Sequence, residues 1–589
     1  MKKNIIYNKV IIPAFVAVIG LLSSCSAFDG FLTVYPTNQI TGEKFWEDKN
    51  DLENVLFACY RQMATEAFAE RMIAWGELKS DNFDLATTSN ENLVNLMTAN
   101  LLPINSWFSW ASFYKLIGYC NLTLAKGPEV LARDNSFTES DWLPIQAELV
   151  GMRALAYFYL VRAFRDVPFV IKSNDTSVGA TDPVPQTASE AILSFLINDL
   201  EAIKDNGMTN YGNDADNHGR FTKNALYTLL ADIYLWRAAK NSSPDSIAVY
   251  GEQWKNDYAK CVECCDYVIN AMNYKMNEEG VKHYGKNDGY TPELPLMTME
   301  TRSTSYETYN SIFGDKNSHE SIFEVQYGTN ANANAAVDYF YGGWKNGSFN
   351  SGMIKRSMVF EEVSTDVVEA YDVSFYKSDY RLGSSFYYST SQSGTTIPTS
   401  IVKYSAKSIT VSSSASTRDD MTTRRCFTYN SYRNRDNIDA NWIVYRASDP
   451  ILMKAEALVA QGHLGGGFDL AHAVFLRSNP TMQATKDIRP GAYSQQDDMM
   501  DFIFRERQRE FIGEGKRWFD LVRMAYQKGE TSAMLNLLVR KFAGGANAVK
   551  AKMATMNSLF NPVYREEIKV NPALVQNPAW EDDRTSTRK

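Results

Sequence analysis

The chain has 589 residues and a formal net charge of −9 at pH 7. An acidic composition without runs of lysine and arginine excludes nucleic-acid binding, because phosphates are recognised by clustered cations. Seven cysteines in so long a chain are too few for a disulfide scaffold, so folding must depend on a packed core.

The chain begins with a predicted lipoprotein signal peptide over residues 1–24. Three lysines among the first nine residues precede an apolar run at residues 10–22, which is shorter than the roughly 20 residues that span a bilayer. The small residue Ser24 precedes Cys25, whose thiol can carry diacylglycerol. We therefore expect cleavage before Cys25 and lipidation of Cys25, since acyl chains stabilise membrane residence by about 0.8 kcal/mol per buried methylene.

Apolar residues recur at helical spacing through the first and last parts of the chain. They predict helices over residues 45–62, 108–131, 145–164, 254–271, 452–460, 471–476 and 499–524, with two more after the capping residues Thr187 and Thr222. Small residues such as Ala154 and Ala156 stand where neighbouring helices must approach closely. The pattern predicts a mainly α fold of antiparallel helical pairs, stacked as in tetratricopeptide repeats.

The amino-acid composition changes between residues 273 and 449, where asparagine, serine, threonine, glycine and tyrosine dominate and helical periodicity fades. Short alternating runs predict strands at residues 321–327, 401–411 and 426–432. We expect a single domain over residues 25–589, with helical pairs at 25–272, a loop-rich region of short strands at 273–449 and a C-terminal helical part at 450–589. Because a rigid frame holds functional loops in place, the loop-rich region is expected to contact the ligand.

The leading candidates for ligand contact are Tyr339, Tyr341 and Trp344, with Asn346 beside them. Flat aromatic rings can cover the C–H faces of sugars, and amides can satisfy sugar hydroxyls. No predicted helix requires these rings. Replacing Tyr341 and Trp344 by alanine is therefore expected to weaken glycan binding without unfolding the protein. The alternative for each ring is that it anchors a loop to the core.

A second candidate group comes from the N-terminal third of the chain. It combines the polar residues Asp81 and Asn82 with the aromatic residues Trp107 and Trp110. Trp110 could instead pack inside the helix that follows it. These four residues are a weaker prediction than the aromatic segment around Trp344.

No sequence pattern favours catalysis. Glu506, Glu510 and Glu514 are spaced to share one helix face, which suits a retaining glycosidase pair, but arginines crowd the same segment and favour structural ion pairs. Residues 513–516 are interpreted as a turn between helices, because the serine or threonine of a phosphate loop is absent. Neither a zinc-protease motif nor a nucleophile elbow occurs in the sequence. We expect a binding protein without a cofactor.

Three cysteines, Cys261, Cys264 and Cys265, lie on one predicted helix. Zinc needs four ligands from close or converging positions, and no histidine is near them in sequence. They are interpreted as buried or half-buried thiols of this helix.

Five ordered segments resemble the SusD/RagB family of nutrient-binding outer-membrane lipoproteins of Bacteroidetes. They are residues 31–60, residues 148–168 ending in Arg-Asp-Val-Pro, residues 219–223, residues 503–521, and the closing segment 571–578. Arg165 replaces the usual glycine of the second segment. Pro480 follows the late helical hairpin, where the family often has an Asn-x-Val-Arg-x-Arg stretch.

The resemblance implies a tetratricopeptide-like frame anchored on the outer leaflet of the outer membrane and exposed at the cell surface. It implies a SusC-like TonB-dependent transporter as partner, over which the lipoprotein sits as a lid. Glycans are the usual cargo, and peptides are the cargo of RagB-like members. Calcium braces the loops of some relatives. The alternatives from other classes are a glycoside hydrolase and a structural or adhesion lipoprotein.

Overall fold

The computed structural model describes most of the chain after residue 44. The described ranges are 45–86, 90–173, 182–284, 293–298, 305–357, 362–363, 375–376, 379–388, 399–411, 427–479, 494–542 and 544–581. The expected signal peptide, Cys25 and the start of the predicted strand at Cys426 lie outside them. Helices account for most of the described residues and the strands are short, which confirms the mainly α fold class.

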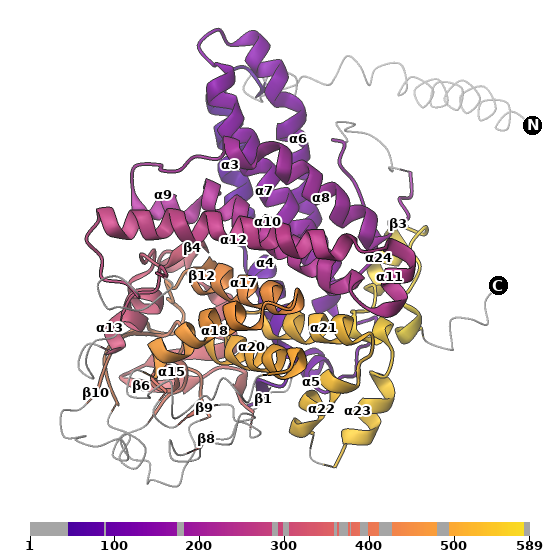
Figure 1. Ribbon diagram of the computed structural model, residues 1–589. Helices are drawn as coiled ribbons and strands as arrows, with labels where there is room; N and C mark the ends of the chain where they lie inside the picture. Colours follow the sequence, from indigo (N-terminus) through magenta and orange to yellow (C-terminus); the bar gives the residue numbers. More distant parts are fainter. Residues whose placement is uncertain are drawn as a thin grey trace, which may run out of the picture.

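The N-terminal part consists of helices that are packed in pairs. They are α3 (Lys49–Met63), α4 (Glu66–Ile73), the π-helical η1 (Ala74–Leu78), α5 (Glu91–Met97), α6 (Ala111–Arg133), α7 (Glu139–Phe164), α8 (Ser189–Ile203), α9 (Asp214–Gly219), α10 (Lys223–Asn241), α11 (Pro244–Tyr250) and α12 (Gln253–Glu278). In Figure 1, α3, α6 and α7 stand together at the top, and the long α12 crosses the middle beside α10.

The helix pair α3 and α6 is antiparallel. Near the end of α3, Gln62 Nε2 donates to Ser112 O at 3.1 Å, close to the start of α6. At the other end, Arg133 Nη1 donates to Trp46 O at 2.6 Å. These contacts fix both ends of the pair, as the predicted helical pairing requires.

Two predicted helix starts differ in outcome. Thr222 begins α10 as predicted, because its hydroxyl accepts the amide hydrogen of Ala225 at 3.3 Å. Thr187 does not cap α8; it lies in β3 (Gln186–Thr187), which pairs with β2 (Val167–Pro168). The amide of Ser189, the first residue of α8, donates instead to Asp166 Oδ1 at 2.9 Å.

The C-terminal helices follow the same pairing. They are α17 (Ser448–Ala460), α18 (Leu464–Ser478), α20 (Gln496–Glu510), α21 (Arg517–Lys528), α22 (Ser532–Leu538), α23 (Ala546–Lys552) and α24 (Arg565–Val570). The helix predicted over residues 499–524 is interrupted between α20 and α21 by the turn that was expected at residues 513–516. Gly513 and Gly515 have φ of 74° and 72° there, a conformation that glycine adopts without strain. Helix α18 begins seven residues earlier than predicted, because glycines 465–467 are helical.

The loop-rich part contains short paired strands. The antiparallel pairs are β1 (Phe83–Leu85) with β7 (Ile354–Arg356), β4 (Ser321–Val325) with β12 (Trp442–Arg446), β5 (Gly342–Lys345) with β6 (Ser348–Ser351), and β10 (Ala406–Val411) with β11 (Phe427–Tyr432). A parallel pair joins β8 (Glu362–Val363) to β9 (Phe375–Tyr376). The short helices here are α13 (Ser305–Tyr309), α14 (Ala335–Tyr341) and α15 (Arg381–Ser385). Figure 1 shows this part at the lower left, below the helical frame.

A contiguous core includes side chains from all three parts of the chain. Trp75 comes from η1, Trp236 from α10, Trp442 from β12 and Trp518 from α21, and all four are fully buried. The loop-rich part therefore shares one hydrophobic core with the helical frame. None of the described helices is both long and apolar enough to cross a membrane.

Candidate functional site

The segment predicted as a ligand platform is partly helical. Tyr339 and Tyr341 lie on α14, and Trp344 lies on β5. Tyr341 is 0% exposed and its hydroxyl donates to Gly513 O at 2.9 Å, while Trp344 is 3% exposed. The expectation that both rings stand free on a loop is therefore wrong. The last turn of α14 directs Tyr341 into the core, where its hydroxyl binds the turn between α20 and α21.

Trp344 is nevertheless the centre of a group of aromatic rings. The Trp344 aromatic cluster consists of Trp344, Phe349, Tyr387, Tyr429 and Tyr432. Trp344 stacks on Tyr432 with centroids 4.6 Å and planes 13° apart, and Phe349 stacks on Tyr387 at 4.7 Å and 21°. Trp344 is buried, whereas the other four rings are half-buried. The tryptophan thus supports a patch of partly exposed aromatic surface.

Backbone contacts between two hairpins hold the Trp344 aromatic cluster together. The amide of Trp344 on β5 donates to Arg433 O at 3.1 Å, and the amide of Arg435 donates to Trp344 O at 2.8 Å. The Tyr429 hydroxyl on β11 donates to Phe386 O at 3.1 Å, which ties β11 to the segment after α15. The rings are therefore held in place before any ligand arrives, which lowers the entropy cost of binding.

Polar groups surround the Trp344 aromatic cluster. Asn346, the predicted polar contact, is exposed at the β5–β6 turn with φ of 53°, and Asn350 on β6 is also exposed. The hydroxyls of Tyr387 and Tyr432 make no hydrogen bond to another described residue. The exposed pair Lys345 and Asp436 is 3.5 Å apart.

Asp81 and Asn82 are buried and bind protein groups. Asp81 Oδ1 accepts from Arg517 Nε at 2.8 Å, and Asn82 Oδ1 accepts from Gln508 Nε2 at 3.0 Å. Burial alone would raise the pKa of Asp81, but Arg517 outweighs it and lowers that pKa to about 2. These contacts hold α20 and α21, so the prediction that Asp81 and Asn82 face a ligand is wrong in this structure.

The two tryptophans of the second group differ in their surroundings. Trp110 packs edge-on against Phe164 with centroids 5.1 Å apart and is 4% exposed, which is the packing alternative raised from the sequence. Trp107 lies 6.2 Å from the Tyr339 ring, whose hydroxyl accepts from Asn90 Nδ2 at 2.8 Å. The structure therefore brings Trp107 and Tyr339 together from distant segments, with Tyr339 half-buried and Trp107 buried.

Glu77 on η1 is a prominent buried group that sequence reasoning missed. Its carboxylate accepts the amide hydrogens of Gly513 at 3.4 Å, Gly515 at 3.0 Å and Lys516 at 3.2 Å. Burial raises the pKa of Glu77 to about 7, although the hydrogen bond from Asn82 opposes the shift. The three amides that donate to Glu77 lie more than 400 residues later in the chain, so no local sequence pattern could indicate this contact.

Glu506, Glu510 and Glu514 form structural ion pairs, as expected. Glu510 binds Arg446, Arg477 and Arg381, and these arginines hold its pKa well below its usual range although burial opposes them. All three of these arginines come from other parts of the chain rather than from α20. Glu506 and Glu514 are likewise fully buried, so none of the three side chains is exposed at the surface.

The three cysteines of α12 are buried, which confirms the interpretation as buried thiols. Cys261 and Cys265 lie one turn apart on this helix. Among the described residues no group of three histidine, cysteine or acidic side chains is placed to hold a metal ion.

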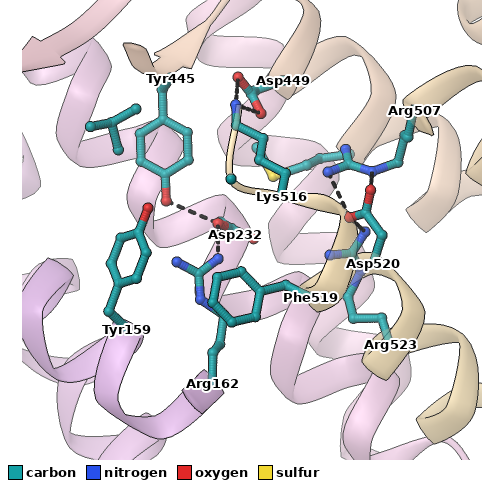
Figure 2. A pocket seen from close by; sticks show the side chains of 13 residues that line it. Tyr159, Arg162, Asp232, Tyr445, Asp449, Arg507, Lys516, Phe519, Asp520 and Arg523 are labelled. Carbon is teal, nitrogen blue, oxygen red and sulfur yellow. Dashed lines mark hydrogen bonds and ion pairs between the residues drawn. The ribbon is translucent and has the colours of Figure 1, made fainter. Parts of the chain in front are cut away.

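A small cavity lies where α7, α10, α17, α20 and α21 meet, and Figure 2 shows its side chains. Its volume is about 20 Å³, which suits roughly one water molecule. Its ion pairs are Arg162 with Asp232, Lys516 with Asp449, and Asp520 with both Arg507 and Arg523. The cavity lies between packed elements of the helical frame and is too small for a sugar ring.

Two family models match the chain. A model described as "SusD family" matches residues 249–580, and a model described as "Starch-binding associating with outer membrane" matches residues 31–235. The chain is 23% identical over 527 residues to SusD-like protein P38 of Formosa agariphila, covering 86% of this chain and 89% of that relative.

Solved structures share the fold. A SusD homolog from Bacteroides thetaiotaomicron has a TM-score of 0.64 at 18% identity, covering 92% of this chain and 99% of that one. NanU of B. fragilis has a TM-score of 0.62 at 17% identity, covering 93% and 100%. The first family model alone spans more than half of the chain, and the chain therefore belongs to the SusD family.

Proposed function

We propose that the protein is a lipid-anchored outer-membrane lipoprotein that binds oligosaccharides at the cell surface. It delivers them to a SusC-like TonB-dependent transporter, over which it acts as a lid, and it is not an enzyme. Membership of the SusD family supports this role, together with the outer-membrane association in the description of the second family model. The lipoprotein signal ending at Cys25 supports the anchor.

The Trp344 aromatic cluster is the observation that carries the proposal. Its four half-buried rings present apolar faces that the C–H surface of a sugar can cover. The hydroxyls of Tyr387 and Tyr432 are available for sugar hydroxyls, and Asn346 lies at the exposed hairpin turn beside them. Apolar faces bordered by a few polar groups are the usual composition of a binding site for small molecules.

The charges beside the cluster favour a neutral glycan. Lys345 pairs with Asp436, and Arg435 pairs with Asp338 at 2.9 Å. Because each cation of these two pairs already has a carboxylate partner, neither offers an uncompensated charge to an acidic sugar. Neutral oligosaccharides, with malto-oligosaccharides as the first probe, are the proposed ligand class.

Four assays of the chain without residues 1–25 separate the alternatives. A glycan array and calorimetry are expected to detect neutral oligosaccharides, and incubation with polysaccharide is expected to leave it uncleaved. Shortened products would identify a glycoside hydrolase. An empty glycan array with hits in a peptide library would identify a peptide-binding member of the family.

The anchor and the partner are tested in cells. Cys25→Ala is expected to release the protein from the membrane fraction, and the wild-type protein is expected to co-purify with a large β-barrel protein. Recovery of the wild-type chain in the soluble periplasm, or without a barrel, would contradict this part of the proposal. Calcium bracing of the loops remains a separate expectation, and repeating the binding assay with EDTA tests it.

A further inference from the structure

Two buried thiols face each other across the antiparallel pair α3 and α6. The Sγ atoms of Cys59 and Cys120 are 4.0 Å apart, and both side chains are fully buried. The hydrogen bonds at both ends of the helix pair keep the two cysteines in register. Cys261 and Cys265 are also buried, but they lie on the same helix, where a covalent bond would link no second element.

We propose that Cys59 and Cys120 form a disulfide that clamps α3 to α6 when the chain folds in the presence of a disulfide oxidant. The Sγ atoms are 4.0 Å apart and must approach by about 2 Å to reach the bonding distance of a disulfide. The oxidant is a low-molecular-weight disulfide or the disulfide of a thiol oxidoreductase.

The reaction is two successive thiol–disulfide exchanges. The Cys59 thiolate attacks one sulfur of the oxidant, forming a mixed disulfide and releasing one thiolate. The Cys120 thiolate then attacks Cys59 Sγ, forming the Cys59–Cys120 bond and releasing the second thiolate. The two cysteines lose two electrons, the oxidant gains them, and the two thiol protons leave through solvent to the released thiolates.

The bond forms before the helices are fully packed. In the folded protein, the hydrogen bond with Cys120 and burial both raise the pKa of the Cys59 thiol, and only the thiolate reacts. Neither sulfur is accessible to an oxidant in that state. The same burial protects the finished disulfide from reductants.

The cross-link closes a long loop, because the two cysteines are 61 residues apart. Closing such a loop restricts the unfolded chain and stabilises the folded one. In a chain of this length the expected gain in melting temperature is about 3 °C.

Refolding under defined redox conditions tests the proposal without depending on the function of the protein. The chain without residues 1–25 is refolded from denaturant either in a glutathione redox buffer or in dithiothreitol, then denatured with iodoacetamide and mapped by mass spectrometry. After glutathione, the peptides of Cys59 and Cys120 are expected to be joined with the loss of two hydrogens, whereas Cys261, Cys264 and Cys265 are alkylated.

Thermal unfolding provides the second readout. Glutathione-refolded wild type is expected to melt about 3 °C above dithiothreitol-refolded wild type. The double variant Cys59→Ala, Cys120→Ala is expected to show no such difference. Alkylation of both Cys59 and Cys120 in protein refolded with glutathione would overturn the proposal, as would a redox-dependent shift that persists in the double variant.

Discussion

Arg446 and Glu510 form an ion pair from which water is excluded. Arg446 Nη1 lies 2.6 Å from Glu510 Oε1, and both side chains are 0% exposed. The pair joins β12 to the end of α20, so it connects the loop-rich part to the C-terminal helices. Removing one member of a buried pair leaves an uncompensated charge in a medium that solvates it poorly.

Glu510→Gln is therefore expected to destabilise the protein by about 3 to 5 kcal/mol. Three arginines, Arg381, Arg446 and Arg477, lose their shared carboxylate in this variant. Chemical unfolding measures the change. Glu263→Gln is the matched control, because Glu263 pairs with Lys260 on an exposed face and should change stability by less than about 1 kcal/mol. Equal effects of the two substitutions would contradict the structural role of Glu510.

Gly76→Ala is expected to destabilise the protein by at least about 2 kcal/mol. A Cβ atom at Gly76 would lie 1.8 Å from Gly515 O, which is a backbone atom that cannot move aside cheaply. Gly118→Ala is the control, since a Cβ there meets nothing within 4 Å and alanine favours the helix. A Gly76→Ala protein as stable as Gly118→Ala in thermal unfolding would show that η1 and the turn after α20 are not in close contact.

The raised pKa of Glu77 predicts a specific dependence of stability on pH. Burial raises this pKa from 4.5 in the unfolded chain to about 7 in the folded protein. Between these values the unfolded chain has released its proton while the folded protein keeps it. The contribution of Glu77 is therefore present below pH 4.5 and is lost as pH rises through 7, by about 3 kcal/mol in total.

Glu77→Gln removes this ionisation and isolates it from other groups. The free energy of unfolding of the variant, relative to wild type, is expected to increase by about 3 kcal/mol between pH 4.5 and pH 8. Chemical unfolding at several pH values measures this difference. A constant difference between the two proteins across that range would show that Glu77 titrates normally.

The helical frame could be predicted because its signals are local. Apolar spacing located α6, α7, α10 and α12, and Thr222 marked the start of α10. The acidic residues of α20 were identified as ion-pair members from the arginines around them. The partners of Glu510 could not be predicted, since Arg381 and Arg446 come from segments 129 and 64 residues away.

The candidate site was predicted only in part. Trp344 and Asn346 were chosen for their chemistry in a glycine-rich segment. The structure places Trp344 beneath the half-buried rings and Asn346 at the exposed β5–β6 turn, and ligand contact by either residue stays a prediction. Tyr341 was assigned to the same surface because α14 is too short to give a clear helical period. Tyr429 and Tyr432 come from β11, and Tyr387 comes from the segment after α15. No local sequence pattern indicates that these residues contact Trp344.

Trp344→Ala is expected to reduce both stability and ligand binding. The ring is 3% exposed, so its loss opens a cavity at a cost of about 3 to 5 kcal/mol, and it also removes the support of the half-buried rings. Trp344→Phe keeps part of the packing and should lie between wild type and alanine in both measurements. If the Trp344→Ala protein is as stable as wild type, Trp344 is not part of the core, and this prediction is contradicted.

Calorimetry on the double variant Tyr387→Ala, Tyr432→Ala tests the central claim most directly. Both rings are half-buried, so the variant is expected to stay folded but to bind neutral oligosaccharides at least about tenfold more weakly, a loss of about 1.4 kcal/mol. Tyr274→Ala on α12, where the side chain is 65% exposed, should bind as wild type does. Wild-type affinity in a folded double variant would contradict ligand binding at the Trp344 aromatic cluster.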